Sequence, residues 1–280
     1  MTSQSKSNEP LALRVCGLTK SYLRRDGLGL KGRPVLAAEA VTFDIPRGKT
    51  LALIGSSGSG KSTVARCVSR IETPDEGEIW IGDTNIARLP PSVLRPFRSR
   101  IQMIFQDAAS AINPRFTAQQ VVEEPLLFQE HTKRKQLRHI VGQLMRELGL
   151  RPEWAERRAH DFSGGQKQRL VIARALALKP EILILDEALG GLDLSTQAQI
   201  ANLLLDLQAS RSLTYLLISH DLRLVAQITD SVAVMSAGKI VEQGAAAQIL
   251  EKPVQEETRR LVGLPEVRAI TLAAGAGGRL

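Results

Sequence analysis

The sequence feature that most constrains this chain is a short segment rich in glycine and serine, which lies between an apolar run and an amphipathic pattern. The apolar run, residues 50–54, reads as a buried strand. The pattern that follows carries Val64, Cys67/Val68 and Ile71 on one face, as an α-helix would. Between them stand Gly55, Ser56, Ser57, Gly58, Ser59, Gly60, Lys61, Ser62 and Thr63. A strand, a glycine-rich loop ending in Lys-Ser-Thr and a helix, in that order, predict a phosphate-binding loop.

The residue types in this loop match what a triphosphate requires. Glycines let backbone N–H groups converge on phosphate oxygens, and the N-terminus of the next helix adds partial positive charge. We expect Lys61 to reach the terminal phosphates and the Ser62 hydroxyl to ligate Mg²⁺. A flexible Gly/Ser turn is the alternative, which the Lys-Ser pair and its flanking elements disfavour. By itself the loop predicts binding of a nucleoside triphosphate and nothing more specific.

Length and composition limit the class of protein. A chain of 280 residues with 43% hydrophobic residues forms one large domain or two small ones with a real core. No apolar stretch reaches the roughly 20 residues that span a bilayer, and residues 1–10 lack the apolar part of a signal sequence. We therefore expect a cytosolic chain in which Cys16 and Cys67 are reduced thiols.

The formal net charge of +8 fits either nucleic acid or an anionic membrane surface as a partner. The basic residues are dispersed, apart from residues 133–135 and Arg138, and few aromatic residues accompany them to stack on bases. We interpret them first as a solvated face, second as a sign of membrane proximity and third as a nucleic-acid site.

The segment before the loop is predicted to be antiparallel β-structure. Residues 11–15 and 41–45 are candidate strands, and residues 24–34 between them read as a surface loop. Tyr22 stands just before that loop. A lone tyrosine is commonly a half-buried core residue, and the alternative is a flat face on which adenine stacks.

The middle of the chain interrupts the alternation of strands and helices. Residues 77–83 read as a strand entering a tight turn, and residues 101–105 as a strand that stops at Gln106-Asp107. A loop follows to residue 117, and then a helical stretch with Gly149 as its stop. We therefore predict an α/β core that carries an inserted helical subdomain at about residues 107–170.

A second glycine-rich helix start follows the insertion. Ser163 is the predicted cap of a helix that begins with Gly164, Gly165 and Gln166. Such a helix N-terminus is ready to bind an anion.

Two carboxylates follow the next strand. Residues 181–187 read as a fully buried parallel strand with Asp186 and Glu187 at its carboxyl end, where open α/β sheets bind ligands. Asp186 fits a Mg²⁺ ligand acting through water, and Glu187 fits the base that polarises the attacking water. An ordinary helix start is the alternative interpretation of this Asp-Glu pair.

One histidine stands at a comparable position. Residues 215–218 form another predicted buried strand, and His220 lies just beyond its carboxyl end. A lone histidine is usually structural, but at this edge it can contact a γ-phosphate. Residues 232–242 then read as a hairpin. Residues 251–280 form a C-terminal extension whose Ala/Gly-rich end, from residue 272, is expected to be disordered.

Together these segments resemble the nucleotide-binding subunits of ATP-binding cassette (ABC) transporters over about residues 11–250. The most specific match is Phe162 to Gln166, which resembles the family's Leu-Ser-Gly-Gly-Gln signature, followed by residues 182–187. The resemblance implies a RecA-like α/β core with an antiparallel β subdomain and a helical subdomain, and ATP hydrolysis with Mg²⁺ as cofactor.

The resemblance also implies roles for single residues. Tyr22 would stack on adenine, Gln106 would sense Mg²⁺ and couple to a membrane subunit, and His220 would contact the γ-phosphate. Asp193 would take part in communication between protomers. The signature, Ser163 and Gly165 above all, would close over ATP held by the partner protomer.

The sequence departs from the family pattern at two places. Phe162 replaces the usual leucine, a change expected to matter little. Residues 188–191 read Ala-Leu-Gly-Gly where the family typically has Pro-Thr-Ser-Ala, and the added glycines are expected to loosen the loop after Glu187.

Shorter segments narrow the resemblance to importers of dipeptides, oligopeptides and nickel. These are residues 105–107, 110–115 and 124–125, while residues 186–188, 192–194 and 219–225 look most like the nickel-import subunit. The implied partners are two transmembrane permease subunits, a second ATP-binding subunit, identical or paralogous, and indirectly a periplasmic solute-binding protein. The implied place is the cytoplasmic face of a bacterial inner membrane, without nucleic acid. Nickel and peptides both remain open.

Two alternatives from other classes remain. One is a soluble cassette protein acting on ribosomes or DNA; such proteins usually carry two cassettes or a long coiled-coil insertion, which this sequence does not show. The other is a module that binds ATP without turnover, which Glu187 and His220 disfavour.

Overall fold

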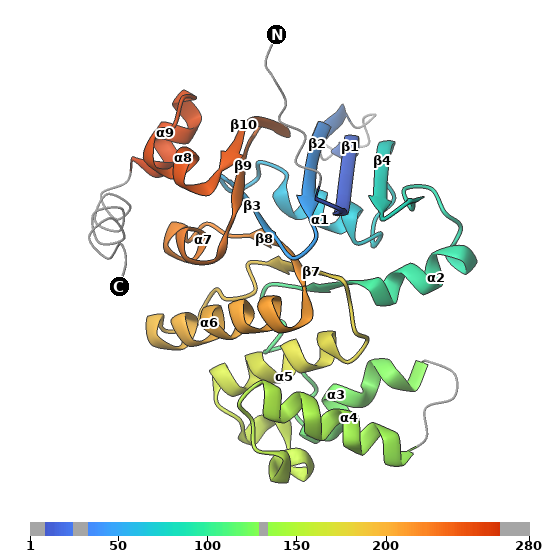
Figure 1. Cartoon of the computed structure of the whole chain (residues 1–280). Coiled ribbons are helices and arrows are strands. Elements are labelled where there is room, and N and C mark those ends of the chain that lie inside the picture. The colour runs from blue at the N-terminus through green and yellow to red at the C-terminus, as the bar shows by residue number, and fades with distance from the viewer. Residues whose placement is uncertain (1–8, 25–32, 129–133, 264–280) are drawn as a thin grey trace.

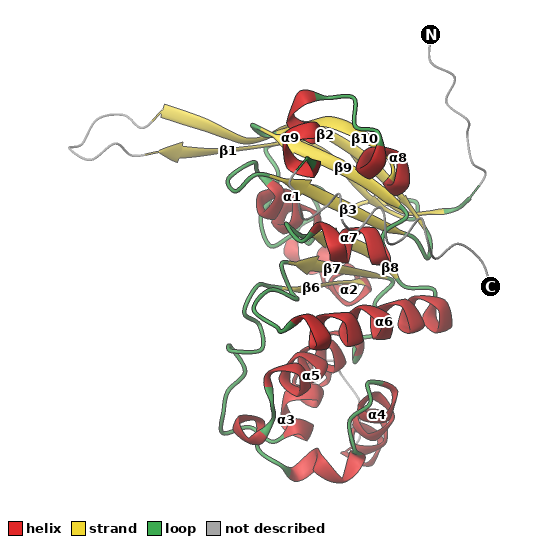
Figure 2. Ribbon diagram, turned by 90° about the vertical axis from the view of Figure 1, so that its left-hand side faces the viewer, coloured by secondary structure: helices red, strands yellow, loops and turns green. Residues whose placement is uncertain are grey.

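The computed structural model describes residues 9–24, 33–128 and 134–263 (Figure 1). Its strands form two sheets, a larger one that is parallel apart from its edge strand and a smaller antiparallel one. Helices pack on the larger sheet, and a group of helices extends away from it (Figures 1 and 2). The α/β core, the antiparallel β-structure and the helical insertion together confirm the predicted fold class.

The larger sheet has the strand order β10-β9-β3-β8-β7-β6. Strands β3, β7 and β8 are buried along their whole length, as expected for parallel strands covered on both faces. Because β6, β7, β8, β3 and β9 run parallel, their carboxyl ends meet at one edge, where α/β sheets hold ligands. The strands are β3 (Thr50–Gly55), β6 (Ile101–Ile104), β7 (Ile182–Asp186), β8 (Thr214–Ile218), β9 (Ser231–Ser236) and β10 (Lys239–Ala245).

The smaller sheet comes from the N-terminal part of the chain and has the order β2-β1-β4-β5. Its strands are β1 (Leu11–Arg24), β2 (Arg33–Pro46), β4 (Glu76–Ile81) and β5 (Thr84–Asn85). Helix α1 (Lys61–Val68) packs between this sheet and the larger one, because its buried residues Val64, Cys67 and Val68 join the apolar residues of both sheets in one core. Figure 2 shows the helix below the antiparallel strands.

A second core lies on the opposite face of the larger sheet. Apolar residues of β3, β7 and β8 pack there against the helices that follow the insertion, and this core continues into the helical group. The helices of this core are α6 (Leu194–Arg211), α7 (Leu222–Ile228), α8 (Ala246–Glu251) and α9 (Glu256–Val262), whereas α2 (Pro91–Arg100) contributes Leu94 to the first core. The helical group contains α3 (Ala118–Glu123), η1 (Glu124–Phe128), α4 (Arg134–Glu147), η2 (Pro152–Glu156), η3 (Ala159–Asp161) and α5 (Gly164–Leu176).

Three local expectations need correction. Strand β1 continues past Val15 to Arg24, and Leu23 and Arg24 pair with Pro34 and Arg33, so only residues 25–32 of the expected loop remain, outside the described residues. The helix after the phosphate loop ends at Val68, and the backbone turns at Arg70 (φ 56°). Ile71 therefore lies beyond the helix and is not part of the apolar face of α1. It is 54% exposed.

The C-terminal segment is structured up to residue 263, the last described residue. The Glu242 carboxylate accepts hydrogen bonds from the backbone N–H groups of Val254 (2.8 Å) and Gln255 (3.0 Å), just before α9. Residues 264–280, which include the segment expected to be disordered, lie outside the described residues. Among the helices that are described, none has both the length and the apolar character needed to cross a bilayer.

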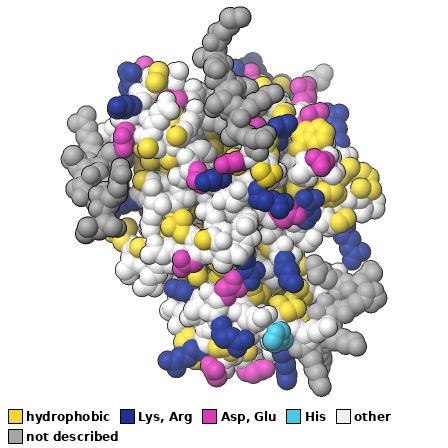
Figure 3. Space-filling model, viewed as in Figure 1, with side chains coloured by type: hydrophobic (Ala, Val, Ile, Leu, Met, Phe, Trp, Pro, Cys, Tyr) yellow, Lys and Arg dark blue, Asp and Glu magenta, His cyan; other side chains and the backbone are white. Residues whose placement is uncertain are grey.

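Charged side chains are mixed on the surface, which agrees with a solvated basic face. Figure 3 shows basic and acidic groups interspersed on one face of the molecule. Arg100 pairs with Glu181 at 2.7 Å and Lys49 with Asp230 at 3.1 Å. Most pairs of this kind are partly exposed, and each contributes little to stability.

Candidate functional site

The glycine-rich loop is held between two distant segments of the chain. A Cβ atom at Gly60 (φ 104°) would lie 1.9 Å from the carbonyl oxygen of Ala37, and one at Gly55 would lie 2.2 Å from that of Met235. The carbonyl of Ser59 accepts a hydrogen bond of 3.0 Å from the backbone N–H of Gly238. Both glycines are therefore required by close backbone contacts as well as by the shape of the loop.

Lys61 begins α1 and turns its side chain back into the loop. Its Nζ donates to the carbonyls of Gly55 (2.9 Å) and Ser56 (2.8 Å) and lies 3.3 Å from Ser59 Oγ. The residue is only 6% exposed. Burial lowers the pKa of this ammonium group, while the nearby carboxylates of Glu187 and Asp186 oppose that shift. The loop thus encloses a partly desolvated cation, which attracts anions more strongly than an exposed lysine.

The structure brings Ser62 and Asp186 together, although they are far apart in sequence. The Ser62 hydroxyl, at the start of α1, donates to Asp186 Oδ1, at the end of β7, at 3.0 Å. Burial raises the pKa of the Asp186 carboxyl, against the hydrogen bond from Ser62. A hydroxyl and a carboxylate beside a phosphate loop are oxygen ligands of the kind that Mg²⁺ prefers, so these residues fit the ion.

Glu187 and His220 stand at the ends of neighbouring strands. Glu187 Oε1 lies 3.5 Å from His220 Nδ1, and the backbone N–H of Glu187 donates to the carbonyl of Ile218 at 2.9 Å. Glu187 has φ 48°, an uncommon value for a residue with a side chain. The imidazole is 71% exposed, whereas the glutamate side chain is 27% exposed. The pair therefore combines a shielded carboxylate with a solvent-accessible imidazole.

Gln106 follows β6 at the same edge of the sheet. The residue is exposed, and the next one, Asp107, has φ 57°. Within the described residues, no hydrogen bond joins its side chain to Ser62 or Asp186. The structure thus places Gln106 near the carboxyl ends of the strands without bringing it into the Ser62–Asp186 contact.

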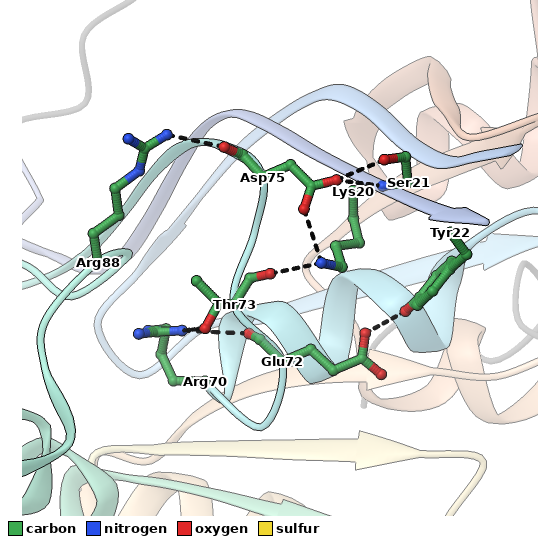
Figure 4. Close-up of polar contacts among 8 residues, drawn as sticks. All are labelled: Lys20, Ser21, Tyr22, Arg70, Glu72, Thr73, Asp75 and Arg88. Carbon is green, nitrogen blue, oxygen red and sulfur yellow. Dashed lines mark hydrogen bonds and ion pairs between the residues drawn. The ribbon is translucent and has the colours of Figure 1, made fainter. Parts of the chain in front are cut away.

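Tyr22 is predicted as an aromatic platform, and the residue is 39% exposed. Its hydroxyl donates to the Glu72 carboxylate, and Lys20 Nζ lies 5.8 Å from the centre of the ring (Figure 4). Burial and this hydrogen bond raise the pKa of the phenol, and the Thr63 side chain also interacts with it. The ring therefore lies near the start of α1, with part of its surface open.

Ser163 caps α5, as the sequence predicts. Its Oγ accepts from the backbone N–H of Gln166 at 3.4 Å, and Gln166 Oε1 accepts from the backbone N–H of Ser163 at 3.1 Å. A Cβ atom at Gly164 would lie 3.9 Å from Leu192 Cδ2, and one at Gly165 would lie 2.6 Å from Thr196 Cγ2. The signature segment is thus packed against the start of α6.

Asp193 caps α6 beside this segment. Its carboxylate accepts from the Ser195 hydroxyl (2.6 Å), from the Thr196 backbone N–H (2.9 Å) and from the Thr196 hydroxyl (2.7 Å). These bonds, those from the Ser195 and Thr196 hydroxyls first, hold the pKa of Asp193 well below its usual range. Between Glu187 and Asp193, Ala188 and Leu189 are buried, and Gln197 Nε2 donates to the Leu189 carbonyl at 3.2 Å.

Sequence reasoning missed several residues that hold the site in place. They are Arg66 and Glu72, which link α1 to Tyr22, and the turn around Gly238, which supports the loop. No motif marks Glu72 or Gly238, because the residues that they contact, Tyr22 and Ser59, lie far away in the sequence. A Glu six positions after an Arg, just beyond a short helix, is the single hint that the sequence offers.

The fold and the loop geometry define a nucleotide-binding protein of the phosphate-loop class. The sequence model of the family described as ABC transporter matches residues 38–190, more than half of the chain. The chain belongs to the ABC transporter family. It is an ATP-binding subunit and an ATPase.

Curated relatives support the same assignment. The chain is 44% identical to a probable peptide ABC transporter ATP-binding protein of Sinorhizobium fredii over 256 residues, covering 91% of this chain and 72% of the relative. It is 40% identical to the dipeptide transport ATP-binding protein of Haemophilus influenzae over 262 residues, covering 94% of this chain and 80% of the relative.

A solved structure confirms the fold. A dimeric ATP-binding cassette in a post-hydrolysis state, bound to ADP and Pi, superposes with a TM-score of 0.72 at 26% identity. The match covers 84% of this chain and 98% of that chain. The predicted ABC ATPase fold is therefore correct.

Proposed function

We propose that this chain energises the import of short peptides across a bacterial inner membrane by hydrolysing ATP. The observation that carries the ATPase half is Lys61, enclosed by loop carbonyls beside the Ser62–Asp186 pair. The import half is supported by relatives that are named peptide and dipeptide transport proteins. Nickel is the second candidate solute, favoured by the sequence of residues 186–188 and 219–225.

The loop and the two carboxylates divide the chemistry between them. Backbone N–H groups of the loop and Lys61 would bind the phosphates, and the Tyr22 ring would stack on the adenine. Ser62 and, through water, Asp186 would hold Mg²⁺, with Gln106 as a further contact. The ion would neutralise charge on the phosphates.

Glu187 is the proposed general base. Its carboxylate would accept the proton of the attacking water, and its position at the carboxyl end of β7 directs it to the ligand edge. His220 Nδ1, 3.5 Å away, would orient this carboxylate and offer its other ring nitrogen to the γ-phosphate.

The signature segment is proposed to serve a second protomer. The capped start of α5 exposes Ser163 and Gly164 and is packed against α6 in its own chain. Figures 1 and 2 show α5 well separated from α1, the helix that follows its own phosphate loop. A helix N-terminus that is ready for an anion but distant from the cis loop fits the ATP of a partner subunit. Asp193, next to this start, would then lie where the two protomers meet.

Mixing two defective variants tests this arrangement. In a Glu187→Gln background, which should keep ATP-bound dimers intact, Lys61→Ala and Ser163→Arg chains are each expected to dimerise poorly. Mixed, they form a heterodimer with one complete site, which combines Lys61 of one chain with Ser163 of the other. ATP-dependent heterodimer should therefore appear on size-exclusion chromatography.

Ser210→Arg, at an exposed position near the end of α6, is the matched control and should dimerise like its parent. If the parent dimerises with ATP but the mixture elutes like its separate components, the trans arrangement is wrong.

The proposed partners are two permease subunits, a second ATP-binding subunit, identical or paralogous, and, indirectly, a periplasmic solute-binding protein. The chain would sit on the cytoplasmic face of the inner membrane, held there by the permeases. Because selectivity for the solute would rest with those partners, no residue of this chain is assigned to the solute.

Deletion of the gene tests the import assignment. Uptake of labelled dipeptides is expected to fall, while export of any compound is unchanged. A parallel assay of nickel uptake decides between the two solutes, because only one of the two should be lost. Normal uptake of both solutes in a clean deletion strain would contradict the importer assignment.

A further inference from the structure

The short segment between α1 and β4, residues 69–75, forms hydrogen bonds with the end of β1 that carries Tyr22 (Figure 4). The Asp75 carboxylate accepts from Lys20 Nζ (2.8 Å), from the Ser21 backbone N–H (2.7 Å) and from the Ser21 hydroxyl (2.8 Å). These bonds, that from Lys20 first, lower the pKa of Asp75 to about 2. The backbone just before Tyr22 is therefore fixed by a carboxylate that stays ionised over the neutral pH range.

Glu72 in the same segment has two partners, one at each oxygen. One oxygen accepts the Tyr22 hydroxyl, and the other lies 3.2 Å from Arg66 Nη1. Arg66 Nε in turn donates to the carbonyl of Ser62 at 3.1 Å. Three consecutive polar contacts thus connect the Tyr22 side chain to Ser62, the second residue of the phosphate-binding helix.

The segment itself is anchored from below by a buried arginine. Arg70 is 8% exposed, and its guanidinium donates to the carbonyls of Ile86 (2.8 Å) and Leu89 (3.2 Å) and to the Thr73 hydroxyl (2.9 Å). Arg88 donates to the Asp75 carbonyl at 2.9 Å. Glu72 therefore projects from a backbone that is held on both sides, and not from a free loop.

We propose that Glu72 is a positioning residue for nucleotide recognition, which holds the Tyr22 ring in one orientation at a fixed place relative to the phosphate loop. The inference rests on the proposed function, in which Tyr22 contacts the base. In this proposal Glu72 supports the part of the ATP affinity that depends on the base. Lys61 and the loop provide the part that depends on the phosphates.

The physical reason is the freedom of a half-exposed ring. Without its hydroxyl partner, the Tyr22 ring can sample other rotamers. Binding of the base must then order the ring, and the entropy lost in doing so weakens the affinity. Ordering one side chain changes an affinity by about two- to tenfold. Because the phenol keeps its proton, its pKa being raised, the hydroxyl remains a donor to Glu72 at neutral pH.

The test compares ATP with inorganic tripolyphosphate, which lacks base and sugar, by calorimetric titration of the full-length chain. Glu72→Ala is expected to weaken ATP binding by about three- to tenfold and to change tripolyphosphate binding by less than about twofold. Tyr22→Phe, which removes only the hydroxyl, should have the same effect, and the double variant should be no weaker than either single one. Glu72→Gln keeps an acceptor and should retain most of the affinity.

Glu76→Ala is the matched control, because Glu76 is an exposed carboxylate four positions after Glu72, at the start of β4, and it should leave both affinities unchanged. Equal losses for ATP and tripolyphosphate in Glu72→Ala would show that Glu72 supports the phosphate loop, which overturns the proposal. Additive losses in the double variant would overturn it too. If Glu72→Ala does not fold, Tyr22→Phe and Glu72→Gln carry the test.

Separate experiments distinguish failure of this proposal from failure of the proposed function on which it rests. If Tyr22→Ala binds ATP as tightly as the parent, the base lies elsewhere and Glu72 has no such role, while the phosphate loop stands. If Lys61→Ala binds ATP as tightly as the parent, the assignment of the loop itself is wrong.

Discussion

Replacement of Lys61 by alanine is expected to abolish tight ATP binding. The ammonium group is a buried cation with three oxygen partners in the loop, and it is the group best placed to exchange those partners for phosphate oxygens. Charge-assisted hydrogen bonds contribute about 1.5–3 kcal/mol each, so the loss of two corresponds to roughly a hundredfold or more in affinity. Titration calorimetry measures this directly.

Lys49→Ala is a suitable control, because Lys49 is a half-exposed lysine paired with Asp230 at the opposite end of β3. It should bind ATP like the parent. Thermal unfolding should accompany both measurements, because removal of Lys61 also leaves loop carbonyls without their donor. A folded Lys61→Ala protein with parental affinity would mean that the triphosphate does not lie in this loop.

Replacement of Glu187 by glutamine is expected to preserve ATP binding and to remove turnover. The amide has nearly the same size, so the backbone at φ 48° and the bond to the Ile218 carbonyl should persist. The amide is a far weaker base than a carboxylate, and general-base catalysis contributes roughly a hundredfold to ten-thousandfold. Phosphate release should therefore fall by at least about two orders of magnitude, while calorimetry shows unchanged affinity.

Glu181→Gln serves as the comparison, because Glu181 precedes the same strand and pairs with Arg100 far from the ligand edge. It should hydrolyse ATP at close to the parental rate. Parental turnover in Glu187→Gln would instead remove Glu187 from the role of base.

Local patterns in the sequence predicted much of this fold. Three features are each encoded by residues close together in the sequence. They are the loop with its strand and helix, the buried strand before Glu187 and the cap at Ser163. Hydrophobic periodicity and capping chemistry act over that range, so each element could be recognised without knowledge of the others.

Contacts between distant segments could not be predicted in the same way. Nothing near Tyr22 indicates that Glu72 will accept its hydroxyl, and nothing near Gly60 indicates that the carbonyl of Ala37 will touch it. The extension of β1 was missed for the same reason, because the strand continues through its pairing with β2 and β4. Roles such as that of Gln106 came from family resemblance and stay predictions.

The position of β3 in the sheet has a consequence for the order in which the protein can mature. The strand that leads into the phosphate loop is flanked by β8 and β9, and the Thr50 backbone N–H reaches Asp230, 180 positions further along the chain. The turn at Gly238 then closes over Ser59. A ribosome that adds about 5–20 residues per second therefore releases the loop long before its neighbours exist. A nascent chain should remain unable to capture nucleotide until the second half has emerged, so ATP binding reports completion of the whole core.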